Sequence, residues 1–127
     1  MPTEAQLGDI ARAGFEVVIN LDQQPSRYAL PDERGTVEAL GMIYEQIPVV
    51  WDSPGHAEFV RFCDALERYA DRRVFVHCVA NYRASVFMAL YRIRRLGWPP
   101  AAALAELTQV WQPNETWQKF IASELAQ

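Results

Sequence analysis

A histidine and a cysteine stand side by side at the end of a short apolar run, and an arginine follows five positions after the cysteine. The run is V-F-V at 74–76, the pair is His77-Cys78, and the arginine is Arg83. β-Branched and aromatic residues predict a buried strand, and the apolar pattern from Ala84 onward predicts a helix. The cysteine therefore opens a loop between a strand and a helix N-terminus.

A cysteine in that position is suited to nucleophilic chemistry. The helix dipole, the N–H groups of the loop and the guanidinium of Arg83 all favour the thiolate of Cys78 over its thiol. The same N–H groups and Arg83 would hold a bound oxyanion such as phosphate. The sequence thus predicts a nucleophile and an anion site in one loop, whose other members are Val79, Ala80, Asn81, Tyr82 and Ala84.

The composition is that of an ordinary globular protein. The chain has 127 residues, of which 50% are hydrophobic and 22% charged, so we expect one domain spanning residues 1–127. The net charge is −4, and there is no basic tract, which argues against nucleic acid as a partner. No apolar run approaches the roughly 20 residues that span a membrane, and the N-terminus does not resemble a secretory signal. Two cysteines make no disulfide framework, so we expect a cytoplasmic protein.

Helical and strand-like segments alternate along the chain. Hydrophobic periodicity, glycines and prolines predict helices at 4–13, 32–40, 56–70, 84–96, 101–110 and 114–126, and strands at 15–21, 42–50 and 74–76. Alternation with short connections indicates an α/β domain with a mostly parallel sheet. Sites in such sheets form at the carboxyl ends of the strands. We therefore expect Asp22 and Gln23, Trp51 and Asp52, and the segment 78–83 to meet at one cleft.

The motif His77-Cys78, a short loop, then Arg83 and Ser85 at a helix start resembles the signature of the cysteine-dependent protein tyrosine phosphatase superfamily. The strand at 17–21, the Ile47-Pro48-Val49 run before an aspartate-bearing loop and the helix before the cysteine strand resemble small dual-specificity-like phosphatases, especially the compact bacterial branch. The resemblance in element order covers most of the chain, while the specific motif covers about nine residues. It implies a three-layer α/β sandwich with a four- to five-stranded, mostly parallel sheet flanked by helices.

The resemblance also implies a role for each residue of the motif. Cys78 would be the thiolate nucleophile that forms a phosphocysteine intermediate, and Arg83 would chelate the phosphoryl oxygens. Ser85 would assist the departing thiolate when water attacks the intermediate. His77 would order the loop and favour the thiolate. Asp52 resembles the general acid that protonates the leaving oxygen.

The loop departs from the family pattern in one respect. Four residues separate Cys78 from Arg83 where the family has five, so Ala84 occupies the usual arginine position. Asn81 replaces the expected glycine, although asparagine tolerates a left-handed conformation better than most residues. The spacing resembles that of rhodanese-type sulfurtransferases, whose cysteine carries a persulfide. A shorter ring of amides suits a single sulfur or a small oxyanion.

Simpler structural roles remain open for the same residues. Cys78 could be a small buried hydrophobe, Arg83 could pair with a helix-flanking carboxylate, and Asp52 could be a turn residue before the helix that starts near His56. Asp22 and Arg27 are weaker candidates, for the rim of a substrate site.

Three functions follow from these alternatives. The first is a phosphatase for phosphotyrosine-like or other phosphomonoesters, with a phosphorylated protein or small phosphoester as substrate and phosphate or sulfate bound in the loop. The second is sulfur transfer through a persulfide on Cys78. The third is a non-catalytic module that binds an anion. No metal or organic cofactor is indicated, because the two histidines and two cysteines lack metal-ligand spacing.

Overall fold

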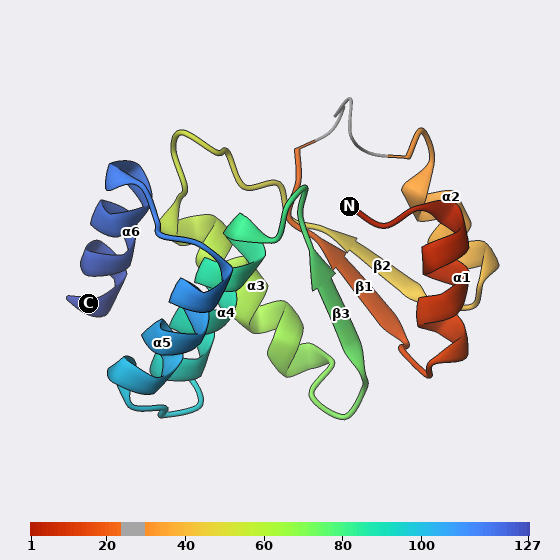
Figure 1. The fold of residues 1–127 in the computed structure, drawn as a ribbon. Coiled ribbons are helices and arrows are strands. Elements are labelled where there is room, and N and C mark those ends of the chain that lie inside the picture. The colour runs from red at the N-terminus through yellow and green to blue at the C-terminus, as the bar shows by residue number, and fades with distance from the viewer. Residues whose placement is uncertain (24–29) are drawn as a thin grey trace.

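The sheet is the centre of the molecule, with helices on both faces (Figure 1). The computed structural model describes residues 1–23 and 30–127. Its strands are β1 (Val17–Asn20), β2 (Ile43–Gln46) and β3 (Val74–His77), all parallel and ordered β2-β1-β3. The α/β three-layer prediction is confirmed. The expected count of four to five strands is wrong for the described residues, which form three, because they contain only three β-prone runs.

The helices follow the predicted order. They are α1 (Glu4–Arg12), α2 (Glu33–Ala39), α3 (His56–Arg68), α4 (Tyr82–Arg94), α5 (Pro100–Val110) and α6 (Glu115–Leu125). Helices α1 and α2 cover one face of the sheet and α3 to α6 lie on the other (Figure 1). Helix α4 begins two residues before the predicted Ala84. Tyr82 and Ala84 therefore belong to the first turn of α4 rather than to the loop.

Strand β1 is buried on both faces because helices cover both faces of the sheet. Alternate side chains of a strand point to opposite faces, and this divides the core into two parts. Val17 and Ile19 enter the larger part, which also contains buried residues of α3, α4, α5 and α6. Val18 enters the smaller part, with Leu7 of α1 and Val37 of α2. The uninterrupted apolar run in the sequence is thus explained by burial on both sides.

Backbone hydrogen bonds join the carboxyl ends of the strands. The Leu21 N–H donates to the His77 carbonyl at 2.8 Å, and the Val49 N–H donates to the Leu21 carbonyl at 3.0 Å. These bonds bring the segments that follow the three strands to the same edge of the sheet. The predicted convergence of strand ends at one edge is thus supported, but the expected single cleft is not formed by all of them, since Asp22, Gln23 and Asp52 do not line the cavity of Cys78 and Arg83.

An aromatic cluster ties the segment after β2 to the C-terminal helices. Trp51 lies 5.5 Å from Trp111 and 5.7 Å from Trp117 between ring centroids, and Tyr82 stacks on Trp111 at 4.5 Å. The indole N–H of Trp117 donates to the Trp51 carbonyl at 3.0 Å. The tryptophans of this cluster pack against one another and hold the segment after β2 on α6.

Across residues 1–23 and 30–127, no helix has the length and apolar character needed to cross a membrane. In the same ranges, no group of three or more His, Cys, Asp and Glu side chains could hold a metal ion.

Candidate active site

The cysteine loop is short and closed by a residue in the left-handed conformation. Strand β3 ends at His77, Cys78 follows with 1% of its surface exposed, and α4 begins at Tyr82. Asn81, directly before the helix, has φ 70° and ψ 6°. A non-glycine residue adopts this conformation most readily when it is asparagine or aspartate. The prediction that Asn81 could replace glycine in the turn is confirmed.

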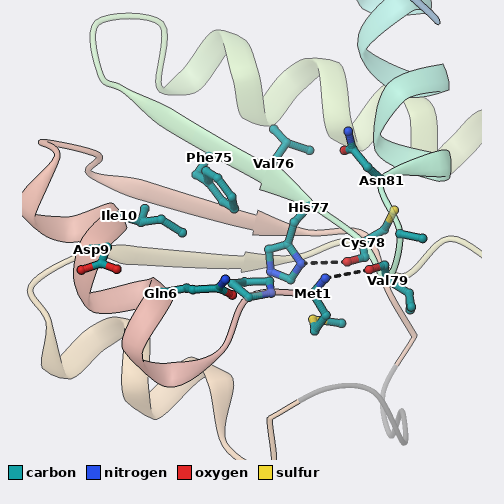
Figure 2. A pocket seen from close by; sticks show the side chains of 12 residues that line it. Met1, Gln6, Asp9, Ile10, Phe75, Val76, His77, Cys78, Val79 and Asn81 are labelled. Carbon is teal, nitrogen blue, oxygen red and sulfur yellow. Dashed lines mark hydrogen bonds between the residues drawn. The ribbon is translucent and has the colours of Figure 1, made fainter. Parts of the chain in front are cut away.

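His77 is fixed from two sides. Its Nδ1 lies 3.2 Å from the Cys78 carbonyl oxygen, and its Nε2 lies 2.9 Å from Oε2 of Glu33. Because a carbonyl oxygen can only accept, Nδ1 is the donor in the first contact. Figure 2 shows the imidazole directed at the loop carbonyl. His77 thereby links the start of α2 to the backbone of the nucleophile loop.

Glu33 was not identified from the sequence. It is buried at the first position of α2, and its Oε1 has no hydrogen-bond partner among the described residues. An acidic residue in the first turn of a helix is ordinary, because it complements the helix dipole. The sequence therefore carried no sign that this carboxylate turns inward to a histidine.

Arg83 is held by two acceptors at the carboxyl ends of neighbouring segments. Its Nη1 donates to the Val49 carbonyl and its Nη2 donates to Oδ1 of Asp22, both at 3.0 Å. The side chains of Arg83 and Asp22 are 8% and 6% exposed, so this is a buried ion pair. The sequence left open that Arg83 pairs with a helix-flanking carboxylate; its partner is instead Asp22, which follows the end of β1. The sequence also suggested Asp22 for the rim of a substrate site, which is wrong because Asp22 is buried. Arg27, the other residue suggested for the rim, lies outside the described residues.

Cys78 and Arg83 nonetheless face a common cavity of about 410 Å³. The cavity is lined by Trp51, Cys78, Val79, Ala80, Tyr82 and Arg83. A thiol, a guanidinium and the backbone of the loop therefore meet in one space. Trp51 and the 38% exposed Tyr82 supply an aromatic wall beside them.

A second cavity, of about 670 Å³, lies on the side of α1 (Figure 2). His77 and Cys78 line it together with Gln6, Asp9 and Ile10 of α1. The amino group of Met1 donates to the Val79 carbonyl at 2.7 Å in this region. The loop is thus bordered by a cavity on either side.

Two residues assigned catalytic roles lie outside the Cys78–Arg83 cavity. Asp52 is exposed on the turn after Trp51, and Trp51 itself lines the cavity. The Ser85 hydroxyl donates to the Tyr82 carbonyl at 2.7 Å and accepts from the Trp111 indole at 3.2 Å. Ser85 also lines a separate cavity of about 200 Å³. The roles of Asp52 and Ser85 remain predictions.

The second cysteine has a different environment. Cys63 lies on the buried face of α3, and desolvation by burial raises the pKa of its thiol to about 11. A thiol with this pKa is protonated at neutral pH and is a poor nucleophile. Cys63 is therefore an unreactive core residue.

His56 contacts the end of the chain rather than the loop. Its Nδ1 lies 2.7 Å from Oε1 of the buried Glu124, which joins the start of α3 to the last turn of α6. The histidine is half exposed and serves as a contact between helices.

Comparison with known proteins gives matches among solved structures alone, since neither a family model nor a curated protein matches the chain. A protein of Shewanella putrefaciens CN-32, described as a "putative phosphatase (DUF442)", is 34% identical with a TM-score of 0.88, over 99% of this chain and 81% of its own. Tk-PTP in its active form is 21% identical with a TM-score of 0.79, over 98% of this chain and 86% of its own. TpbA of P. aeruginosa is 21% identical with a TM-score of 0.77, over 97% of this chain and 76% of its own. At 21% identity, the last two matches show that this chain shares their fold.

Proposed function

This chain belongs to the DUF442 branch of the protein tyrosine phosphatase superfamily, and we propose that it hydrolyses phosphomonoesters, phosphotyrosine-like esters among them, through a phosphocysteine intermediate. One observation carries the proposal: Cys78, Arg83 and the loop backbone line a single cavity. A nucleophile and an anion-binding cation in one cavity are the two parts that phosphoryl transfer from an ester needs.

The reaction would proceed in two displacements. The Cys78 thiolate attacks phosphorus, an S–P bond forms, and the P–O bond to the leaving group breaks with its electron pair on oxygen. A proton from Asp52 would neutralise that oxygen. Water, giving its proton back to Asp52, then attacks phosphorus, and the S–P bond breaks to return the thiolate and release phosphate. Ser85 would donate to the departing sulfur after leaving the Tyr82 carbonyl, its present acceptor.

The contact between His77 and Glu33 holds the imidazole in place beside the Cys78 backbone. A hydrogen bond from Nδ1 to the Cys78 carbonyl fixes the backbone on which the sulfur is carried. Inorganic phosphate and sulfate are the expected ligands of the loop in the absence of substrate, and a phosphorylated protein or small phosphoester is the expected substrate. We expect the protein to act in the cytoplasm.

A specific observation favours sulfur transfer as a second candidate. Four residues lie between Cys78 and Arg83, and the charge of Arg83 is already compensated by Asp22. In this reaction the thiolate would attack the outer sulfur of thiosulfate and release sulfite. Cyanide would then take the sulfur from the persulfide as thiocyanate and return the thiolate.

Parallel assays separate the candidates. The purified protein is expected to release p-nitrophenolate from p-nitrophenyl phosphate, with a rate proportional to protein concentration. Thiocyanate formation from thiosulfate and cyanide, without phosphoester turnover, would replace the proposal with sulfur transfer. Absence of both reactions, together with thermal stabilisation by phosphate, would identify a non-catalytic anion-binding module.

Removing the proposed acid should depend on the leaving group. Asp52→Asn is expected to lower kcat for phenyl phosphate by about 10²-fold or more, because general acid catalysis contributes about 10² to 10⁴. The loss should be much smaller for p-nitrophenyl phosphate, whose leaving oxygen needs little protonation. Initial rates with both esters test this, and Asp71→Asn, at an exposed turn, is the matched control. An equal loss for both esters would remove Asp52 from the acid role.

A further inference from the structure

Both ring nitrogens of His77 face a hydrogen-bond acceptor. Nδ1 lies 3.2 Å from the Cys78 carbonyl oxygen (Figure 2), and Nε2 lies 2.9 Å from Oε2 of Glu33. A neutral imidazole has one N–H and one bare nitrogen, and neither a carbonyl nor an ionised carboxylate has a hydrogen to donate. A neutral His77 beside an ionised Glu33 would therefore leave one of the two contacts without a hydrogen.

The pair must accordingly hold one more proton, placed between Nε2 and Oε2. Either His77 is an imidazolium beside a carboxylate, or a protonated Glu33 donates to a neutral ring. In both arrangements Nδ1 keeps its own hydrogen for the Cys78 carbonyl. The side chains of His77 and Glu33 are 7% and 1% exposed, so neither contact is shared with bulk water.

The charged groups that border the pair have other partners among the described residues. They are, on α2, Asp32 with the Gly35 N–H and Arg34 with the Tyr44 ring; at the loop, Arg83 with Asp22 and the Met1 amino group with the Val79 carbonyl; and on α1, Asp9 with Arg12. On β2, burial raises the pKa of Tyr44 to about 12, so its hydroxyl stays neutral up to pH 10. The Cys78 thiol, the loop N–H groups and the N-terminus of α4 also lie nearby, and a substitution at Glu33 leaves them unchanged.

We propose that Glu33 is a positioning residue for the nucleophile: by sharing a proton with His77, it keeps the Nδ1–H on the Cys78 carbonyl. When a base in solvent removes that proton, one ring hydrogen remains for two acceptors. A hydrogen bond to an ionised carboxylate is about twice as strong as one to a neutral acceptor, so the hydrogen should then reside on Nε2. The Cys78 carbonyl loses its donor, and the loop backbone is released. The consequence for hydrolysis rests on the proposed function.

Side-chain ¹⁵N NMR spectra of the full chain test the proposal without turnover, because they report which ring nitrogen carries hydrogen. The other histidine, His56, is identified by the loss of its signals in His56→Gln. In the wild type, Nδ1 of His77 should be protonated at pH 6.5, and Nε2 alone should be protonated as the pH approaches 10. Glu33→Gln supplies an uncharged amide that can donate to Nε2, so Nδ1 should stay protonated at every pH. Glu38→Gln, exposed on the same helix, should behave as the wild type does.

Hydrolysis of p-nitrophenyl phosphate gives a second measurement. At pH 6.5, Glu33→Ala should lower kcat/KM about tenfold, the effect of losing one buried hydrogen bond, and Glu33→Gln should retain most of the wild-type value. The Met1 amino group and the Cys78 thiol are present in all of these proteins, so neither can account for a difference between them.

The proposal is overturned if Nε2 alone is protonated in the wild type at pH 6.5, or if the wild type and Glu33→Gln show the same tautomer across the pH range. An unchanged kcat/KM in Glu33→Ala also overturns it. Should the Glu33 variants not fold, the wild-type spectra decide alone. The expected spectra without phosphoester turnover would sink the proposed function and leave the role of Glu33 standing, and turnover with Nε2 alone protonated would do the reverse.

Discussion

Replacing Cys78 with serine is expected to abolish phosphoester hydrolysis, lowering kcat by a factor on the order of 10⁴ to 10⁶. Cys78 is the only cysteine that lines the cavity shared with Arg83. A serine hydroxyl at this position stays protonated at neutral pH and would need a general base to attack phosphorus. Initial rates with p-nitrophenyl phosphate, at matched protein concentrations, measure the loss.

The chain supplies its own control cysteine. Cys63→Ala removes the other thiol, which lies in the core and has its pKa raised to about 11 by burial. This variant should retain its rate per folded molecule while melting at a lower temperature, because a buried group is lost. Retained hydrolysis in Cys78→Ser would show that another group attacks the ester. Loss of hydrolysis in both variants would point to folding instead of chemistry.

Replacing Trp117 with alanine is expected to destabilise the protein by about 3–5 kcal/mol, the usual cost of deleting a large buried aromatic side chain. Trp117 is fully buried, and its ring lies 5.7 Å from the rings of Trp51 and Phe120. The substitution also leaves the Trp51 carbonyl without its indole donor. Urea denaturation followed by circular dichroism gives the free energy of unfolding.

Two further variants separate the packing contribution of Trp117 from the contribution of its hydrogen bond and from the general cost of removing a tryptophan. Trp117→Phe keeps most of the packing and loses the hydrogen bond, so it should cost about 1 kcal/mol or slightly more. Trp98→Ala removes a partly buried ring that lies against the Arg92 guanidinium and should cost less than Trp117→Ala. Equal costs for Trp98→Ala and Trp117→Ala would show that the Trp51–Trp117 cluster is not a main source of stability.

Much of the fold could be predicted because it follows from local pattern. The apolar run within 15–21 predicted a strand, and β1 is found there, as the buried central strand of the sheet. Helix ends agreed to within about two residues where glycine, proline or a capping residue marks them, as at Thr3 and Asn114. The strand count was overestimated because it came from family resemblance rather than from the runs in this chain.

The two buried pairs of the site could not be predicted. Asp22 and Arg83 are 61 residues apart, and Glu33 and His77 are 44 apart. A carboxylate at the end of a strand or in the first turn of a helix is commonly exposed at the surface, so its position in the sequence does not show that it is buried. Its burial depends on where another segment places a cation, and no local pattern records that. The sequence therefore located the nucleophile loop but not the two buried carboxylates, Asp22 and Glu33, that contact its arginine and histidine.

The strand that leads into the nucleophile loop lies at one side of the sheet. Within residues 1–23 and 30–127, β3 is paired with β1 alone, whereas β1 is paired on both sides. Separating β3 from the sheet therefore breaks one ladder of hydrogen bonds, and separating β1 breaks two. Local opening requires less free energy where fewer interactions hold a segment. Brief fraying of β3 should thus expose the adjacent Cys78 thiol further to solvent-borne oxidants, long before the domain unfolds as a whole.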